Sequence, residues 1–510
     1  MSFSETSLHR VLEQDYGWLN TSRPLKAEDF KGRILLLDFW TYCCINCLHV
    51  IPDLKKLEAE FGEHLTVIGV HSGKFFNERD EDNIRAAVLR HHIEHPVVND
   101  APFRIWKSFG VRAWPTLVLL NPEGRIDRIY SGEGHLNELR DDIGRLQKAY
   151  TGGYNIEPLP LNLEANKKSP SFLKFPGKLA YAPDRKLLFV SDSSHHRILG
   201  MTLQGEIQLV IGEKESAGWK EGSFSEARFN GPQGLLYVQN ILYVADTENH
   251  LLRKINLNTQ KVTTIAGLGK QGFEREVEGN DALKTPLSSP WDLELSPDEK
   301  EIIIAMAGTH QLWGYHRERA QLRVIAGNGI ESMDDGRYPH NSLSQPSGIS
   351  RLGKKFYFVD SETSSLRVLE DGRITTLIGT GLFDFGFKDG KGKEGQLQHP
   401  LGVFADESGV YIADSYNHAI RRYDPATQKV VNITGKGVSG FFDGGWGYAL
   451  FQEPNDVIKI GDQLFVTDTN NHLIRVIDLQ KKTVRTLELS LPQTTSILCT
   501  EAECIPRDQS

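Results

Sequence analysis

Three of the five cysteines lie within one short segment, at Cys43, Cys44 and Cys47. The last two form a C-x-x-C pair, whose chemistry is thiol–disulfide exchange when it stands at the start of a helix. There the positive end of the helix dipole stabilises a thiolate, and the second thiol lies one turn along, where it can resolve a mixed disulfide. Residues 33–40 form a continuous apolar run and residues 48–61 follow a helical pattern, so the pair falls between a strand and a helix.

The elements around this pair alternate between α and β. Further strands are predicted at 65–70, 116–120 and 125–130, and further helices at 80–92 and 136–150. Such alternation predicts a three-layer α/β sandwich over residues 1–155.

The cysteine segment also carries a resemblance. Asp38, Phe39, Trp40, Cys44, Cys47 and Pro52 follow the pattern D-F-W-x-x-x-C-x-x-C-x-x-x-x-P, and the segment 114–116 (WPT) precedes a strand about 70 residues later. Both features resemble the thioredoxin superfamily, over residues 20–150, and residues 25–32 are closer to its TlpA/peroxiredoxin-like branch. The resemblance implies that Cys44 is the nucleophile, that Cys47 is the resolving thiol and that Asp38 helps to move the proton of Cys47.

The same resemblance implies a substrate groove shaped by Pro115, a cis-proline in this family. Its other expected residues are Trp40, Trp114 and Thr116. Two positions depart from the family pattern. Asn46 stands where most such motifs carry Pro, so the direction of the reaction, reduction or oxidation, stays open. Cys43 stands where Trp is usual, and it could compete for Cys44 or Cys47.

Other interpretations of the cysteine cluster have less support. A haem-attachment motif needs His directly after the second Cys, but Leu48 stands there. The peroxiredoxin T-x-x-C motif requires Pro at the position of Leu37, which makes peroxidase chemistry a minor option. The cysteines could also be small core residues without chemistry. A zinc site would use adjacent residues that fit a tetrahedron poorly: Cys43, Cys44, Cys47 and His49. We therefore expect neither a metal nor another cofactor.

Composition narrows the class of protein. The 510 residues carry 58 Lys+Arg against 67 Asp+Glu, a net charge of −9, so no electrostatic footprint for nucleic acid or an anionic membrane is present. Five cysteines, an odd number, do not make a disulfide framework. The first residues show no secretory signal, and no apolar stretch approaches the roughly 20 residues of a membrane span. These features predict a soluble, cytoplasmic protein.

A second pattern, made of repeats, begins at residue 171. A Val/Ile/Phe-rich strand ends in Asp, x-x-Asn-His follows, and Arg stands seven residues after the Asp, as in LYVAD(246)TENHLLR(253). The Asp position recurs at 192, 246, 306, 360, 414 and 468, with spacings of 54, 60, 54, 54 and 54 residues. A Pro opens each unit, at 176, 232, 290, 346, 400 and 454.

Six units of about four strands each predict a closed six-bladed β-propeller over residues 171–490. The pattern resembles NHL repeats. We expect each Asp to cap a turn and each Arg to bridge to it or to a neighbouring blade. Blade three carries Met306 and Trp313 at these positions, which predicts the most divergent turn. Either 160–172 or 488–498 could supply the strand that closes the ring.

Two shorter segments complete the predicted organisation: a linker at 156–170 and a tail at 491–510. The tail carries Cys499 and Cys504, which together with Cys43 are possible accessory thiols. The linker is short and contains Pro158, Pro160 and Pro170, so we expect the two domains to stay docked, with the Cys44 helix end facing a groove between them.

The pairing of C-C-I-N-C with six NHL repeats is similar to the NHL repeat-containing protein 2 family and its bacterial relatives, over residues 1–490. The resemblance implies a cytosolic protein with a thiol role. The leading hypothesis is a thiol–disulfide oxidoreductase that acts on protein clients, with an external thiol reductant and the propeller as the binding platform. The alternative is a non-catalytic interaction scaffold with an incidental or structural C-x-x-C. Neither hypothesis involves nucleic acid or a membrane.

Overall fold

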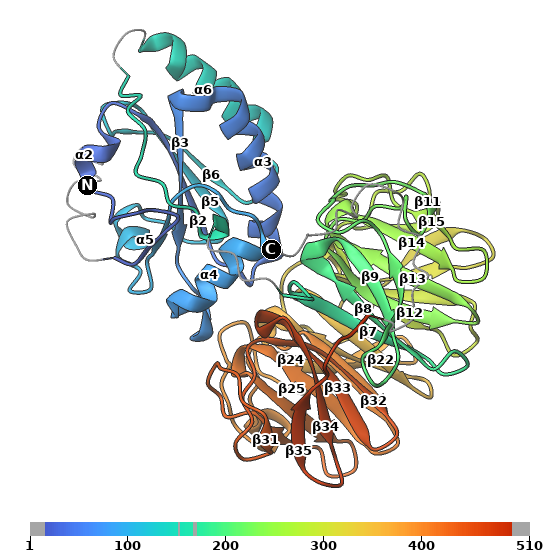
Figure 1. The fold of residues 1–510 in the computed structure, drawn as a ribbon. Helices are drawn as coiled ribbons and strands as arrows, with labels where there is room; N and C mark the ends of the chain where they lie inside the picture. Colours follow the sequence, from blue (N-terminus) through green and yellow to red (C-terminus); the bar gives the residue numbers. More distant parts are fainter. Residues whose placement is uncertain (1–15, 151–153, 167–170, 492–510) are drawn as a thin grey trace, which may run out of the picture.

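The computed structural model describes residues 16–150, 154–166 and 171–491. It contains an N-terminal α/β unit, blue to teal in Figure 1, and a six-bladed propeller coloured from green to red. The predicted fold class, a thioredoxin-like α/β domain followed by an all-β propeller, is confirmed.

The N-terminal unit is built on a six-stranded sheet in the order β1-β4-β3-β2-β5-β6. Strand β2 lies at its centre, parallel to β3 and antiparallel to β5. Every residue of β2 is buried, as its continuous apolar run predicts for a central strand. The strands are β1 (Trp18–Leu19), β2 (Ile34–Trp40), β3 (Leu65–His71), β4 (Val97–Asn99), β5 (Thr116–Leu120) and β6 (Ile126–Ser131).

The helices cover both faces of this sheet. The longest, α3 (Ile45–Phe61), packs its apolar face on the same core cluster as α6 (Leu136–Ala149). The others are α2 (Ala27–Phe30), α4 (Glu81–Arg90), α5 (Arg104–Ser108) and the 3₁₀ turns η1 (Gly62–His64), η2 (Asn77–Arg79) and η3 (Glu164–Asn166). None of the helices in the described ranges is long and apolar enough to cross a membrane.

The propeller consists of six antiparallel sheets, one for each repeat. Blade one has four strands: β7 (Pro176–Ala182), β8 (Leu187–Asp192), β9 (Arg197–Met201) and β10 (Ile207–Ile211). In the next two blades the four main strands are β12 (Pro232–Val238), β13 (Ile241–Asp246), β14 (Leu251–Asn256) and β15 (Lys261–Ala266), then β17 (Pro290–Leu295), β18 (Glu301–Met306), β19 (Gln311–His316) and β20 (Gln321–Ala326).

Blades four to six repeat the arrangement. Their main strands are β22 (Pro346–Leu352), β23 (Lys355–Asp360), β24 (Ser365–Glu370) and β25 (Arg373–Ile378); β27 (Gly402–Asp406), β28 (Gly409–Asp414), β29 (Ala419–Asp424) and β30 (Lys429–Thr434); and β32 (Pro454–Ile460), β33 (Gln463–Asp468), β34 (Leu473–Asp478) and β35 (Thr483–Thr486). The prediction of four strands per unit omits a short fifth strand on the outer edge of blades two to six: β11 (Gly222–Ser223), β16 (Glu278–Asp281), β21 (Gly336–Arg337), β26 (Gly390–Lys391) and β31 (Gly444–Gly445).

The repeated Asp and Arg are structural, as predicted. In blade two, Asp246 Oδ2 accepts a hydrogen bond from Arg253 at 2.8 Å, and Asp246 Oδ1 accepts one from the backbone N–H of Asn230 at 2.8 Å. Arg253 also donates to two backbone carbonyls, those of Arg228 and Lys220. The buried pair therefore ties the turn and the incoming loop to one sheet.

The repeated His joins each blade to the next, a role that the sequence does not reveal. It follows a one-turn 3₁₀ helix and adopts the left-handed conformation, as at His250 and His418. The Nδ1 atom of His250 accepts a hydrogen bond from the backbone N–H of Ser289 at 3.0 Å, and that of His418 accepts one from Glu453 at 3.0 Å. Each blade is thus bonded to the residue directly before the Pro that opens the following one, and in blade four the hydroxyl of Ser364 takes the place of the His.

The turn of blade three contradicts its prediction. Its 3₁₀ turn and the left-handed His310 have the same geometry as the other blades, because backbone hydrogen bonds hold the turn. The side-chain bonds change instead. Gln311 donates to the carbonyls of Arg275 and Gly327, and it accepts a hydrogen bond from the indole of Trp313 at 2.9 Å. In blade three these bonds take the place of an Asp–Arg pair such as Asp246–Arg253 of blade two.

The ring closes through its C-terminal end, the second of the two predicted possibilities. Ser490 runs parallel beside Glu206, and its carbonyl accepts a hydrogen bond from the backbone N–H of Ile207 at 2.9 Å. Its own N–H donates to the carbonyl of Gly205 at 3.0 Å. The last strand segment therefore occupies the outer edge of blade one, which has no fifth strand of its own in the described residues.

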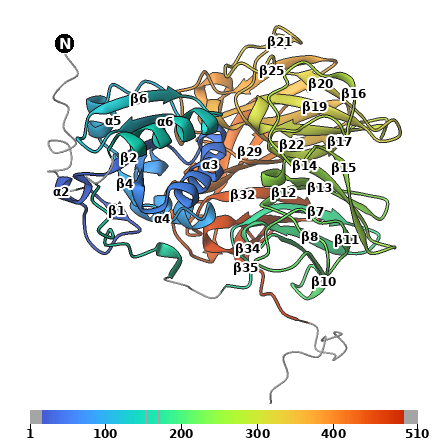
Figure 2. The same ribbon diagram turned by 90° about the horizontal axis from the view of Figure 1, so that it is seen from above.

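The two units are docked, as the short linker predicts. In both views, α3 lies on the side of the N-terminal unit that faces the propeller (Figures 1 and 2). The first part of the linker packs on the N-terminal unit, where the backbone N–H of Asn162 donates to the carbonyl of Asn20 at 2.9 Å. The start of α3, with the cysteine segment, thus lies next to the propeller.

Candidate active site

The three cysteines of the motif differ in their surroundings. Cys44 is the N-cap of α3 and is partly exposed, whereas Cys43 and Cys47 are 2% and 0% exposed. All three are free thiols. Burial raises the pKa of Cys47 well above its usual value, and the hydrogen bond between Cys47 and Cys44 adds to the rise. Cys44 is therefore the most exposed of the three thiols, and its role as nucleophile stays a prediction.

Asp38 lies on β2, buried behind the cysteines. Its Oδ1 has no hydrogen-bond partner among the described residues, and burial raises the pKa of its carboxyl to about 7, against the opposing effect of His95. The negative charge of Asp38 is one of the groups that raise the pKa of Cys47. A carboxyl that titrates near neutral pH can accept a proton from a neighbouring thiol and return it.

The peptide bond between Trp114 and Pro115 is cis, as the resemblance predicts. The indole of Trp114 donates to the carbonyl of Ser72 at 3.0 Å and lies against Trp106, with ring centroids 4.6 Å apart. Trp40 and Thr116 are buried. Contact of these residues with a substrate stays a prediction.

Cys43 lies at the boundary with the propeller. Its Sγ lies 3.8 Å from the hydroxyl of Thr41, and burial, followed by the charge of Glu362, raises the pKa of its thiol well above the usual value. The same carboxylate accepts a hydrogen bond from Lys74 at 2.5 Å. Cys43 thus belongs to a polar cluster at the domain boundary. Its competition for Cys44 or Cys47 stays a prediction.

Glu78, a residue of the N-terminal unit, forms hydrogen bonds to the cysteine segment. Its Oε1 accepts hydrogen bonds from the backbone N–H of Cys43 at 2.9 Å and from the hydroxyl of Thr41 at 2.7 Å, while Oε2 accepts one from Phe75 at 2.9 Å. Burial raises the pKa of this carboxyl to about 7. Glu78 therefore fixes the turn that leads from β2 into α3.

The propeller reaches the motif through Gln345. Its amide nitrogen donates to the carbonyl of Cys43 at 2.8 Å, and its amide oxygen accepts a hydrogen bond from the backbone N–H of Ile45 at 2.8 Å. These two residues flank Cys44. One propeller side chain thus bonds to the backbone on both sides of the candidate nucleophile.

Gln345 belongs to a ring of six residues, one directly before the Pro that opens each blade. All six have positive φ, and each backbone N–H is bonded to the preceding blade: Phe175, Gly231, Ser289, Gln345, His399 and Glu453. Five of them contact the N-terminal unit through their side chains, and the sixth, Gly231, has no side chain. Sequence reasoning missed this ring, although its signal, the residue before each repeated Pro, is visible in the sequence.

His49 provides a second bridge between the domains. Its Nδ1 lies 2.6 Å from Glu133, and its Nε2 lies 2.8 Å from the hydroxyl of Ser289. Gln271 adds a contact of 2.7 Å to Nδ1. His49 is therefore engaged in docking and not with the cysteines. Within the described residues, no three His, Cys, Asp or Glu side chains gather as metal ligands. The predicted accessory thiols Cys499 and Cys504 lie outside the described residues.

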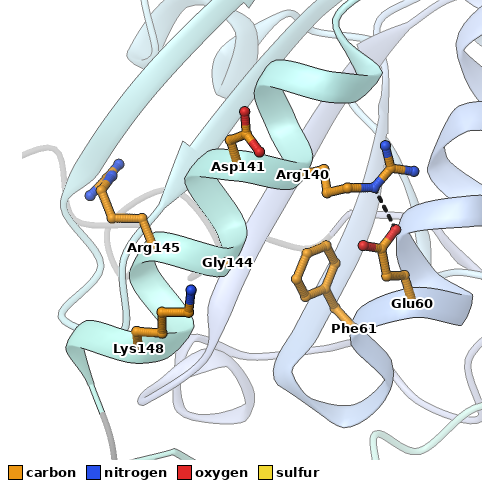
Figure 3. A pocket seen from close by; sticks show the side chains of 7 residues that line it. All are labelled: Glu60, Phe61, Arg140, Asp141, Gly144, Arg145 and Lys148. Atoms are coloured by element: carbon orange, nitrogen blue, oxygen red, sulfur yellow. Dashed lines mark hydrogen bonds and ion pairs between the residues drawn. The ribbon is translucent and has the colours of Figure 1, made fainter.

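A surface hollow of about 500 Å³ lies at the other end of α3 (Figure 3). In Figure 3 Arg140 reaches from α6 to Glu60 on α3, which it contacts at 2.7 Å, and Phe61 lies beside them. The remaining lining residues are Asp141, Gly144, Arg145 and Lys148. Because Glu60 and Phe61 end the helix that Cys44 begins, this hollow is separate from the cysteine site.

Comparison with known proteins agrees with this architecture. A family model described as thioredoxin-like matches residues 32–126. NHL repeat-containing protein 2 of Homo sapiens is 41% identical over 511 residues, a match that covers 92% of this chain and 70% of that protein. The chain belongs to the NHL repeat-containing protein 2 family.

Two further relatives mark the limits of the comparison. The chain is 46% identical over 498 residues to Protein SUPPRESSOR OF QUENCHING 1, chloroplastic, of Arabidopsis thaliana. The match covers 92% of this chain but only 47% of that protein. The chain thus spans about half the length of the plant relative. The N-terminal unit alone is 25% identical over 134 residues to thiol-disulfide oxidoreductase ResA of Halalkalibacterium halodurans, covering 26% of this chain and 73% of that protein.

Proposed function

We propose that the protein is a thiol–disulfide oxidoreductase that acts on protein clients. The observation that carries this proposal is the graded exposure of the pair, with Cys44 partly exposed at the N-cap of α3 and Cys47 buried beside it. The buried Asp38 supports it, because a carboxyl with a pKa of about 7 can exchange a proton with a thiol near neutral pH. A likeness to ResA over the N-terminal unit points in the same direction.

The proposed reaction runs in two exchanges. The Cys44 thiolate attacks one sulfur of a client disulfide, which forms a mixed disulfide and releases the other client sulfur as a thiolate that takes a proton from water. Asp38 then accepts the proton of Cys47, and the Cys47 thiolate attacks Cys44 Sγ. This step forms the Cys44–Cys47 disulfide and expels the second client sulfur as a thiolate, which takes the proton from Asp38, so the client leaves as a dithiol. An external dithiol reductant returns the pair to its reduced form and is itself oxidised to a disulfide.

The propeller acts as the client-binding platform in this proposal. It stands directly over the cysteine segment, so a bound client would meet Cys44 at a high effective concentration. We place the reaction in the cytoplasm, where thiol reductants keep cysteines reduced, with neither nucleic acid nor a membrane as a partner.

The second candidate function is a protein-interaction scaffold. The observation in its favour is the burial of Cys43 at the domain boundary, where it is 2% exposed and its carbonyl accepts a hydrogen bond from Gln345 of the propeller. A titration of the full chain against glutathione buffers separates the two functions. A couple that titrates in the cytosolic range of roughly −220 to −320 mV supports the oxidoreductase. A pair that stays oxidised across that range supports the scaffold.

Trapping of clients tests the oxidoreductase directly. Replacement of Cys47 by Ser stops the second exchange, so the Cys47→Ser chain should accumulate mixed disulfides with clients in cell extract. The Cys44→Ser/Cys47→Ser double variant is the matched control and should accumulate none. Equal adducts in both variants, or none in either, would contradict the proposed function.

A further inference from the structure

The backbone of Gln345 is fixed within the propeller by hydrogen bonds of its own N–H and carbonyl. Its backbone N–H donates to Nδ1 of His310 at 3.0 Å, and its carbonyl accepts hydrogen bonds from the hydroxyl of Ser347 at 3.0 Å and the N–H of Ser361 at 3.2 Å. The residue is 2% exposed and has φ of 63°, so its side chain leaves the blade in one direction. The propeller therefore fixes the backbone from which the side-chain amide of Gln345 extends.

The hydrogen bonds of Gln345 satisfy groups that α3 leaves open. Ile45 is the first residue of the helix, and its N–H has no partner within the helix. The Cys43 carbonyl lies just ahead of the N-cap, in the turn that leads into α3. By bonding to both, the amide spans Cys44 from one side to the other. The backbone of Cys44, with φ of −82° and ψ of 114°, is thereby fixed at both ends.

A second link to the propeller runs through Lys74. Its ammonium is paired with Glu362 of the propeller at 2.5 Å, and its backbone N–H donates to Thr41 Oγ1, which lies 3.8 Å from Cys43 Sγ. The residue before the nucleophile is therefore bonded to the propeller directly through its carbonyl, by Gln345.

We infer that Gln345 is a positioning residue of the thiol site, so that the propeller completes the active-site turn of the thioredoxin-like domain. The inference rests on the proposed function. A neutral amide suits this role, because it ties the turn without placing a charge next to a sulfur that must become negative. A carboxylate at the same position would oppose the thiolate.

Two substitutions in the full-length chain test the role. Gln345→Glu keeps the shape of the side chain and adds a negative charge beside Cys44. We expect the pH midpoint of Cys44 alkylation by iodoacetamide to rise by about one unit, so that alkylation at pH 7 slows about tenfold. Gln345→Met removes both hydrogen bonds without adding charge. Loss of one hydrogen bond should speed hydrogen exchange of the Ile45 amide about tenfold, while Leu48, bonded to the Cys44 carbonyl at 3.2 Å, exchanges as before.

The control is Glu453→Gln, at another position of the ring. Glu453 accepts hydrogen bonds from Tyr42, Asn77 and Arg90 and touches neither neighbour of Cys44. It should change neither the alkylation midpoint nor the exchange of Ile45. The inference is overturned if Gln345→Glu shifts the midpoint no more than Glu453→Gln does, or if Ile45 is equally protected in Gln345→Met. Both measurements need no turnover, so a chain without disulfide reductase activity would refute the proposed function and still report on Gln345.

Discussion

The ammonium of Lys74 and the carboxylate of Glu362 lie 2.5 Å apart across the domain boundary, and each side chain is 5% exposed. Burial disfavours both charges, but their mutual attraction prevails, raising the pKa of Lys74 and lowering that of Glu362. The charge of Glu362 also raises the pKa of the Cys43 thiol, and the Lys74 N–H donates to Thr41, so this pair links domain docking to the cysteine segment.

Replacement of Lys74 by Met should loosen that docking. It leaves the Glu362 carboxylate buried without its cation, a loss that costs about 3–5 kcal/mol in comparable pairs. In the wild-type chain Cys43 is buried at the domain boundary. In Lys74→Met we expect Cys43 to become open to alkylation under native conditions, as measured by mass spectrometry. Lys56→Met is the control, because Lys56 is 58% exposed in its pair with Asp53. Unchanged protection of Cys43 in Lys74→Met would contradict the linkage.

The buried Asp38 predicts a pH-dependent stability. A carboxyl with a pKa of about 7 in the folded chain and 3.8 when unfolded binds more protons in the folded state, so its burial destabilises the fold increasingly as pH rises from about 4 to 7. Asp38→Asn should remove this effect. Its advantage in free energy of unfolding should grow from near zero at pH 4 to about 4 kcal/mol at pH 8, measured by denaturant titration. An advantage that is equal at both pH values would show that Asp38 is not protonated by burial.

Closure of the ring predicts that substitution by alanine lowers stability by different amounts at two glycines with positive φ. A Cβ on Gly205 would collide with the carbonyl oxygen of Glu488 in the closing segment, whereas Gly353 has open space around it. Both substitutions carry the backbone cost of positive φ, so Gly353→Ala should lower the free energy of unfolding by about 1 kcal/mol. Gly205→Ala adds the collision with Glu488 and should lower it by about 3 kcal/mol. Equal effects, measured by urea titration, would mean that the C-terminal segment does not close blade one.

Much of the fold could be predicted, because it depends on local pattern. The strand at 116–120 is found with its predicted bounds, and the repeats place the end of β13 at Asp246. Helix α3 begins at Ile45, three residues before its apolar pattern becomes readable, because Cys44 serves as its N-cap. The divergent turn predicted at Met306 is wrong, since backbone bonds maintain it without the carboxylate.

The candidate site was predictable only on the thioredoxin side. Cys44, Cys47 and Asp38 share a sequence pattern, whereas Gln345 meets Cys43 across 302 residues, and no local rule relates the two. The partners of Gln345 depend on how two finished domains dock. Single-sequence patterns do not record that information.

Disulfide turnover by the full chain tests the central claim most directly. With a protein disulfide such as that of insulin and a dithiol reductant, we expect the wild-type chain to accelerate reduction and the Cys44→Ser chain to fall to the rate of the reductant alone. Circular dichroism of both chains confirms that they are equally folded. Equal rates for the wild-type and Cys44→Ser chains would contradict the account, because Cys44 would then carry no catalysis.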